Sequence, residues 1–249
     1  MSQTMISSRI ERRLARLRFK DSLDLRPASS VVCFTFDDVP QSACIEGAKI
    51  VENCGGRATY YVCGGLDGVD RGDRYFDTED LHRLHASGHE IASHGYGHID
   101  YQQNPLTDVI ADLDRNDEYF ARVGLAPPHH FAFPFGSVSP QVKRHCAARF
   151  FTARGVENKP NAGSTDRALL KAVHLYEGKV GRQQVEDLMT AARIEANWLL
   201  FMTHAVSDRP GEFDTTPAQL RHAVEAAQDH GLPILTMTQA WRHFTNDRV

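Results

Sequence analysis

The chain has 249 residues, 41% of them hydrophobic, which is enough to bury a full core as one compact domain. Its net charge of -4 and its pI near 6.3 give no reason to expect a nucleic acid as a partner. The five cysteines are odd in number and lack CxxC spacing, a pattern typical of reduced, mostly buried thiols.

The first 28 residues differ from the rest and are interpreted as a basic amphipathic N-terminal extension, with the main domain at residues 29–249. Between residues 9 and 20, basic side chains alternate with apolar ones. Two interpretations are open: peripheral contact with an anionic membrane through residues 9–20, or packing across the end of the domain, which is the commoner arrangement. No apolar run has the length of a signal peptide or a membrane span, so we expect a cytoplasmic protein, membrane-peripheral under the first interpretation.

From residue 31 onward, short apolar runs alternate with helical patterns. In chain order, the predicted strands are Val31–Phe36, Arg57–Cys63, Glu90–Ser93, His130–Phe133, Phe150–Ala153, Val173–Tyr176, Trp198–Thr203 and Pro233–Thr236. The predicted helices are Ser42–Asn53, Thr78–Ser87, Pro105–Val123, Ser139–Ala147, Arg182–Ala196, Thr216–Asp229 and Thr238–Phe244. Segments 64–77 and 155–166 are predicted to be long surface loops. The alternation predicts βα units around a parallel sheet.

Two groups of polar side chains directly follow predicted strands. Asp37 and Asp38 come after the first strand, and His94 and His98 come after the strand that ends at Ser93. Because parallel strands end at one edge of a sheet, we expect these side chains to converge. Two imidazoles and one carboxylate can hold a divalent cation with an open position for water, while the neighbouring carboxylate serves as a base. Zinc is the first expectation, and cobalt, nickel or manganese fit the same ligands.

The histidine pair alone is a weak signal, because the chain contains thirteen histidines. Together with four further segments in the correct order, however, it resembles the polysaccharide deacetylases, which are carbohydrate esterase family four, also called the nodulation-factor deacetylase homology domain. The resemblance spans about residues 31–241 and identifies residues 29–249 as the catalytic domain. It implies an irregular, TIM-like (β/α) barrel of seven strands, with the active groove at the carboxyl ends of the strands.

The first two motifs imply the metal site. The run that ends in Asp37 and Asp38 resembles the TFDD motif, which implies that Asp37 is the catalytic base and Asp38 a metal ligand. The segment from His94 to His98 resembles the H[ST]xxH motif, which implies that both histidines complete the metal triad. Gly95 stands where the family has a serine or threonine that supports the loop and does not bind the ion.

The third motif implies an oxyanion site and reveals a departure. The segment 131–136 resembles the RxPxG motif, which implies that the backbone N–H of Phe135 helps to hold the developing oxyanion. Ala132 replaces the arginine that pairs with the base in the family. Arg154, at the end of the next predicted strand, is positioned to replace that arginine, and an ordinary surface arginine is the alternative.

The last motif implies the general acid. The apolar run 199–203 followed by His204 resembles the LxxxxH motif, which implies that His204 protonates the leaving amine, and an imidazole suits that role near neutral pH. The fourth motif, which supplies an aspartate that tunes this histidine, is poorly matched. Asp166 and Asp208 are both candidates for that aspartate, and the sequence does not choose between them.

The implied reaction is the removal of an N-acetyl group from an amino sugar in a glycan or a lipid-linked saccharide, by metal-activated water with an aspartate base and a histidine acid. The missing signal peptide favours a biosynthetic intermediate as substrate. Two alternatives remain: a non-catalytic sugar-binding module, and a metal-independent amidohydrolase acting on a cyclic amide. Retention of the implied base, metal ligands and acid, namely Asp37, Asp38, His94, His98 and His204, argues against the first, and the histidine pair argues against the second. The oligomeric state is not indicated.

Overall fold

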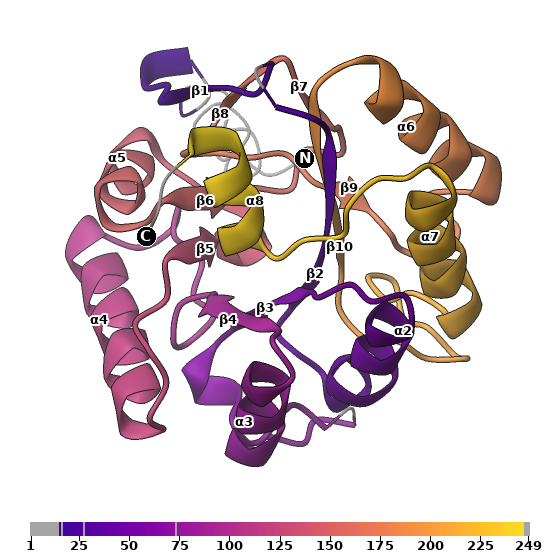
Figure 1. Ribbon diagram of the computed structural model, residues 1–249. Coiled ribbons are helices and arrows are strands. Elements are labelled where there is room, and N and C mark those ends of the chain that lie inside the picture. Colours follow the sequence, from indigo (N-terminus) through magenta and orange to yellow (C-terminus); the bar gives the residue numbers. More distant parts are fainter. Residues whose placement is uncertain (1–14, 16, 27, 73, 247–249) are drawn as a thin grey trace, which may run out of the picture.

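The computed structural model describes residues 15, 17–26, 28–72 and 74–246 and shows a curled sheet surrounded by helices (Figure 1). Most of the predicted basic helix, residues 9–14 and 16, lies outside the described residues. None of the described helices is both long and apolar enough to cross a bilayer.

The sheet follows a seven-strand path in the order β6-β5-β4-β3-β2-β10-β7, and β9 adds to β10 beside this path. Neighbours from β6 to β10 are parallel, whereas β7 is antiparallel to β10. The strands are β2 (Val31–Asp37), β3 (Thr59–Val62), β4 (Glu90–Ser93), β5 (His130–Ala132), β6 (Thr152–Arg154), β7 (Asn161–Ala162), β9 (Val173–His174) and β10 (Asn197–Thr203). The prediction of an irregular seven-stranded (β/α) barrel is confirmed.

The central pair of strands explains why the sheet forms at this place in the chain. All seven residues of β2 and all seven of β10 are buried, as expected for a parallel sheet covered on both faces. Their parallel register aligns Phe34 with Phe201, and the two rings stack with centroids 5.4 Å apart. The apolar runs on which the strand predictions rested therefore form the core.

Helices surround the curled sheet, and one more covers its end (Figure 1). Those around the outside are α2 (Ala48–Asn53), α3 (Thr78–Ala86), α4 (Leu106–Arg122), α5 (Pro140–Arg149), α6 (Arg182–Ile194) and α7 (Pro217–Asp229). The last helix, α8 (Met237–Thr245), is held at the starts of β3 and β4, where Met237 N donates to Thr59 Oγ1 (3.0 Å) and Thr238 N to Glu90 Oε2 (2.9 Å). It therefore closes the barrel at the amino ends of the strands.

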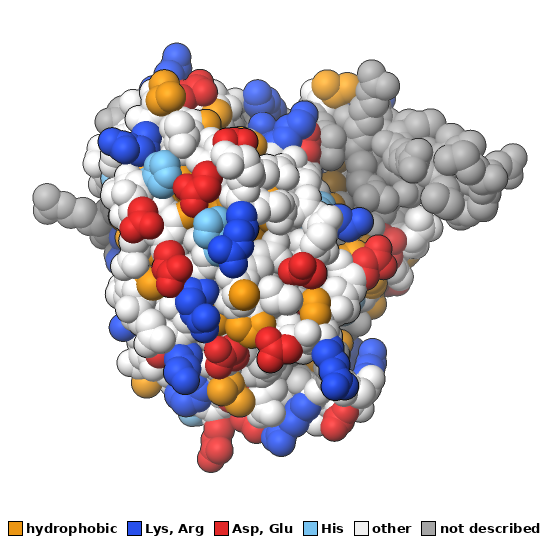
Figure 2. All heavy atoms as spheres, turned by 90° about the vertical axis from the view of Figure 1, so that its right-hand side faces the viewer, with side chains coloured by type: hydrophobic (Ala, Val, Ile, Leu, Met, Phe, Trp, Pro, Cys, Tyr) orange, Lys and Arg blue, Asp and Glu red, His pale blue; other side chains and the backbone are white. Residues whose placement is uncertain are grey.

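The face that carries α6 and α7 has acidic and basic side chains interspersed (Figure 2). All five cysteines are free thiols, and four of them are buried, as their spacing predicted. The exception is Cys54, which is partly exposed.

Several element predictions need correction. Segment 233–236 is not a strand, and only Ile234 forms a single bridge to Val32, because Thr236 already caps α8. The helix predicted from Ser42 begins with a π-helical turn at Ala43–Gly47 before α2. Segment 155–166 is not one long loop: besides β7 it contains β8 (Ser164–Asp166), which pairs with β1 (Ser22–Asp24). Residues 22–24 thus join the fold by pairing with a strand far away in the sequence. Hydrophobic periodicity and strand propensity do not reveal such a pairing.

Candidate active site

A pocket of about 700 Å³ opens at the carboxyl ends of the strands. The implied metal ligands, base, acid and oxyanion residue all line it, whereas Arg154 lies fully buried next to Asp37 and the two candidate aspartates of the fourth motif do not line it. The lining side chains come from the carboxyl ends of the strands from β2 to β6 and of β9 and β10, or from the segments that follow them. The groove therefore lies at the edge of the sheet where the sequence predicted it.

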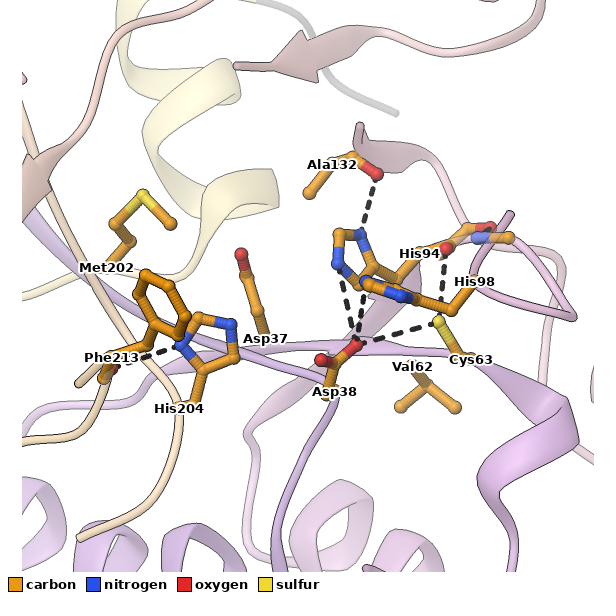
Figure 3. A network of polar contacts seen from close by, with 12 residues as sticks. Asp37, Asp38, Val62, Cys63, His94, His98, Ala132, Met202, His204 and Phe213 are labelled. Carbon is orange, nitrogen blue, oxygen red and sulfur yellow. Dashed lines mark hydrogen bonds and ion pairs between the residues drawn. The ribbon is translucent and has the colours of Figure 1, made fainter. Parts of the chain in front are cut away.

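On one side of the pocket, Asp38, His94 and His98 point toward one another (Figure 3). Their potential ligand atoms all lie within 4.8 Å of one another, with Asp38 Oδ1 3.6 Å from His94 Nε2 and 3.4 Å from His98 Nε2. His94 Nδ1 donates to the carbonyl oxygen of Ala132 at 2.7 Å, which leaves the lone pair of Nε2 facing the carboxylate. Two nitrogens and one oxygen in this arrangement fit a divalent cation.

The protonation state of His98 also agrees with a cation site. Burial, together with the nearby His94, lowers the pKa of His98 to about 4, so this imidazole is neutral at physiological pH, as a metal ligand must be. Cys63 Sγ lies 3.8 Å from Asp38 Oδ1 and 3.1 Å from the carbonyl oxygen of His94, so a buried thiol packs behind both ligands.

Backbone strain is concentrated around this side of the pocket. Asp38, Val39, His98 and Phe135 have φ of 57°, 57°, 48° and 56°, and the other described non-glycine residue with positive φ, Asn246, caps the end of α8. Such conformations cost about 1–3 kcal/mol each and persist only where the surrounding structure imposes them. Val39 is β-branched, and a positive φ is especially unfavourable for such a residue. It is nevertheless fully buried, and its carbonyl oxygen accepts a hydrogen bond from Phe76 N.

A buried carboxylate from α4, which no sequence motif marks, supports the loop between the two histidines. Asp112 accepts hydrogen bonds from Tyr96 N (3.0 Å), Gly97 N (2.7 Å) and the Tyr101 hydroxyl (2.8 Å). Gly95 has φ of +75°, and a Cβ there would lie 2.5 Å from both the Asp112 carboxylate and the Tyr101 hydroxyl. The space of a serine or threonine side chain is thus already filled, which accounts for the glycine. An aspartate within the apolar stripe of the helix was the available signal.

Asp37 forms an ion pair with Arg154, and both side chains are buried. Arg154 is therefore no surface arginine. It ends β6 and lies in register with Ala132 of β5, so its guanidinium comes from the strand next to the one where the family carries its arginine. Burial alone would raise the pKa of Asp37, but Arg154, with His94 and His204, holds that pKa below its ordinary value. Asp37 is consequently an ionised carboxylate at neutral pH.

His204 lies across the pocket, directly after β10, and its ring nitrogen Nδ1 is 3.1 Å from the carbonyl oxygen of Phe213. Neither aspartate named from the sequence contacts it. Asp166 pairs with the buried ammonium of Lys143, and Asp208 is exposed, with no hydrogen bond to His204 in this fully described part of the chain. The sequence did not single out Phe213, whose carbonyl faces the His204 ring, or its neighbour Asp214. Both lie in the loop after β10, which no motif covers.

Phe135 lies on the metal side of the pocket. Its side chain is 57% exposed, and its ring packs on His98 with centroids 4.3 Å apart. Opposite, Phe213 is 52% exposed, and its ring lies 5.6 Å from that of Tyr176. Two exposed aromatic rings therefore flank the opening, which suits the apolar faces of a sugar.

Comparisons with known proteins show the family and the fold. A family model described as polysaccharide deacetylase matches residues 25–150, and no curated protein sequence matches the chain. The Xyl-CE4 domain of a multidomain xylanase from the hindgut metagenome of Trinervitermes trinervoides is similar in structure, with a TM-score of 0.61 and 17% identity over 86% of this chain and 90% of that one.

Two other solved structures share the fold. One is a family 4 carbohydrate esterase from Streptomyces lividans in complex with acetate, with a TM-score of 0.59 and 17% identity over 83% of this chain and 92% of that one. The other is the peptidoglycan deacetylase PdaC from Bacillus subtilis, with a TM-score of 0.57 and 15% identity over 86% and 90%. Since the family match alone covers half of the sequence, the chain belongs to the polysaccharide deacetylase family.

Proposed function

We propose that the protein is a metal-dependent hydrolase that removes an N-acetyl group from an amino sugar in a glycan or a lipid-linked saccharide and releases acetate. The main support is one arrangement: three convergent ligands beside an arginine-paired aspartate, with a histidine in the same pocket. The family and the fold make a carbohydrate deacetylase the expected activity.

Asp38, His94 and His98 are the residues that would hold the cation, with zinc expected first and cobalt, nickel or manganese accepted by the same donors. When bound, such an ion supplies Lewis acidity for water and for the acyl carbonyl. The hydrogen bond from His94 to Ala132 O fixes the ring before any ion arrives, so the site is pre-organised.

The remaining steps are assigned to the protein's own side chains. Asp37, ionised beside Arg154, accepts a proton from the attacking water. The backbone N–H of Phe135 donates to the oxygen on which negative charge develops. His204, in its imidazolium form with a hydrogen on each ring nitrogen, protonates the departing sugar nitrogen through Nε2, because Nδ1 faces the Phe213 carbonyl. The products are acetate and a free amino sugar.

The substrate class is tested with a panel, because one structural relative is a peptidoglycan deacetylase and another the CE4 domain of a xylanase. Acetate release is measured from N-acetylated oligosaccharides, peptidoglycan fragments and an O-acetylated xylan. Each reaction is run with protein as purified, after treatment with a chelator, and after the metal is restored. We expect release from an N-acetylated saccharide that the chelator abolishes and zinc restores.

The two alternative functions predict other results. A sugar-binding module binds members of the panel without releasing acetate. A metal-independent amidohydrolase keeps its activity in the chelator. Metal analysis of the purified protein separates these outcomes further, because about one equivalent of divalent metal, lost in the variant His94→Ala, is expected only for the proposed site.

A further inference from the structure

We propose that Asp214 is the positioning residue for His204: it clamps the loop that holds the Phe213 carbonyl against Nδ1 and so fixes the ring's tautomer and direction. The role of His204 as acid rests on the proposed function, whereas the clamp itself does not. In the family, this task belongs to an aspartate of the fourth motif, which this chain matches poorly.

The contact at the ring decides which nitrogen carries the proton. His204 Nδ1 lies 3.1 Å from the Phe213 carbonyl oxygen, and the same oxygen accepts the backbone N–H of His204 at 3.3 Å. Because a carbonyl oxygen only accepts hydrogen bonds, Nδ1 carries the hydrogen. Nε2 is then the nitrogen available to the pocket that His204 lines.

The Asp214 side chain ties together both ends of this loop. Oδ1 accepts a hydrogen bond from Ala205 N at 2.9 Å, and Oδ2 accepts one from Gly211 N at 2.8 Å. Its backbone carbonyl accepts Glu177 N at 2.8 Å, which anchors the loop to the segment beyond β9. A Cβ at residue 211 would lie 2.9 Å from Asp214 Oδ2, so glycine leaves room for the clamp.

A carbonyl partner differs physically from a carboxylate partner. A carboxylate on Nδ1 would add a full negative charge, whereas the Phe213 carbonyl contributes only a partial charge and a fixed direction. The carboxylate of Asp214 accepts hydrogen bonds from two backbone N–H groups and makes no hydrogen bond to the ring of His204 in this fully described loop. Its removal is therefore expected to loosen the ring's orientation without removing a charge from the ring's direct partner.

The test is the ¹⁵N NMR spectrum of the His204 imidazole in the full-length, metal-free chain without substrate. Wild type should show the Nδ1–H tautomer. Asp214→Ala should move it toward the Nε2–H form that an unconstrained imidazole prefers, and Asp214→Asn, which keeps one acceptor oxygen, should lie between. The matched control Asp208→Ala removes an exposed carboxylate from the same loop and should keep the wild-type tautomer.

Amide spectra of residues remote from the loop show whether each variant is folded. If Asp214→Ala does not fold, Asp214→Asn still decides the test. A folded Asp214 variant with an unchanged tautomer, or a changed tautomer in Asp208→Ala, overturns the proposal. With a deacetylation substrate, Asp214→Ala should lower kcat by about 10–100-fold and leave KM within about threefold, since the acid acts in the chemical step. Failure of wild type to release acetate would refute the proposed function but leave the tautomer result standing.

Discussion

The two sides of the pocket are built in different ways. On the metal side, His94 is almost fully buried, and the loop between the two histidines is held by side-chain hydrogen bonds from α4. On the acid side, His204 is partly exposed and its ring is held by one backbone carbonyl of a loop. Strain follows the same division, since residues 204–214, all of them described, include no positive φ.

The difference shows what each side has to do. Ligands that surround an ion must meet within a few tenths of an ångström, and a buried, over-determined scaffold provides that accuracy while tolerating strain. An acid that donates one proton needs one ring nitrogen directed at the leaving group, and a single well-placed acceptor on the other nitrogen supplies that direction. Changes to the ligands and their supports on the metal side should therefore weaken or abolish metal binding, whereas changes to the orientation of the acid should lower the rate by degrees.

The largest expected effect separates the ion from the base. His94→Ala removes one of three ligands and should abolish both metal binding and activity. Asp37→Asn removes the base but no ligand, so it should keep the ion and lose turnover by about 10²–10⁴-fold. Metal content and acetate release, measured on the same preparations, check both. A wild-type rate for Asp37→Asn would refute the assignment of the base.

The second prediction concerns the ion pair below the pocket. Arg154 holds the pKa of Asp37 below its ordinary value against the effect of burial, so Arg154→Ala should raise that pKa. The base then becomes protonated at higher pH, and the acid limb of the kcat/KM profile should move upward by about 1–3 pH units.

Arg154→Lys is the matched control, because it keeps a positive charge, and it should recover part of the profile. Breaking a buried pair also destabilises by about 3–5 kcal/mol, so thermal unfolding is recorded for each variant. If Arg154→Ala is folded and keeps the wild-type acid limb and kcat/KM, Arg154 does not replace the missing arginine of the third motif.

The third prediction tests the buried support of the metal side. Asp112→Asn replaces an acceptor of three hydrogen bonds with an amide that can accept fewer, so the histidine loop should loosen and metal affinity should fall by about 10–100-fold. Tyr101→Phe removes one of the three donors and should have a smaller effect. Competition with a metal-binding dye measures both. Equal affinity in wild type and Asp112→Asn would mean that α4 does not support the site.

The sequence predicted those elements of the fold whose own residues carry a hydrophobic pattern. The apolar runs of β2 and β10 mark their own strands, since both are buried on both faces. β1 and β8 are only three residues long each and pair across a long sequence separation, with Asp24 opposite Ser164, so only the folded chain reveals them. The segment at Ile234 looked like a strand by composition, but the helix cap that follows limits it to one bridge.

The same distinction applies to the site. Asp38 and the two histidines follow strand ends that the sequence predicts, so their convergence followed from topology. Asp112 and Asp214 act on backbone N–H groups brought near by the fold, and no spacing rule relates them to the residues that they support. The resemblance to a family does not identify these two aspartates either, because the family's motifs assign support of the histidine loop and of the acid histidine to other positions.

The smallest expected effects come from the two exposed rings, and they sharpen the comparison most directly. Phe135→Ala removes a ring that packs on the ligand His98, so it should weaken metal affinity slightly as well as raise KM by about 3–10-fold. Phe213→Ala removes a ring but keeps the backbone carbonyl that faces His204, so KM should rise similarly while kcat and the imidazole tautomer stay as in wild type. Metal titration, steady-state kinetics and the imidazole ¹⁵N spectrum are measured for both variants. A tautomer change in Phe213→Ala would show that the side chain, and not only the clamped backbone, orients the acid, and the two sides of the pocket would then differ less than their contacts indicate.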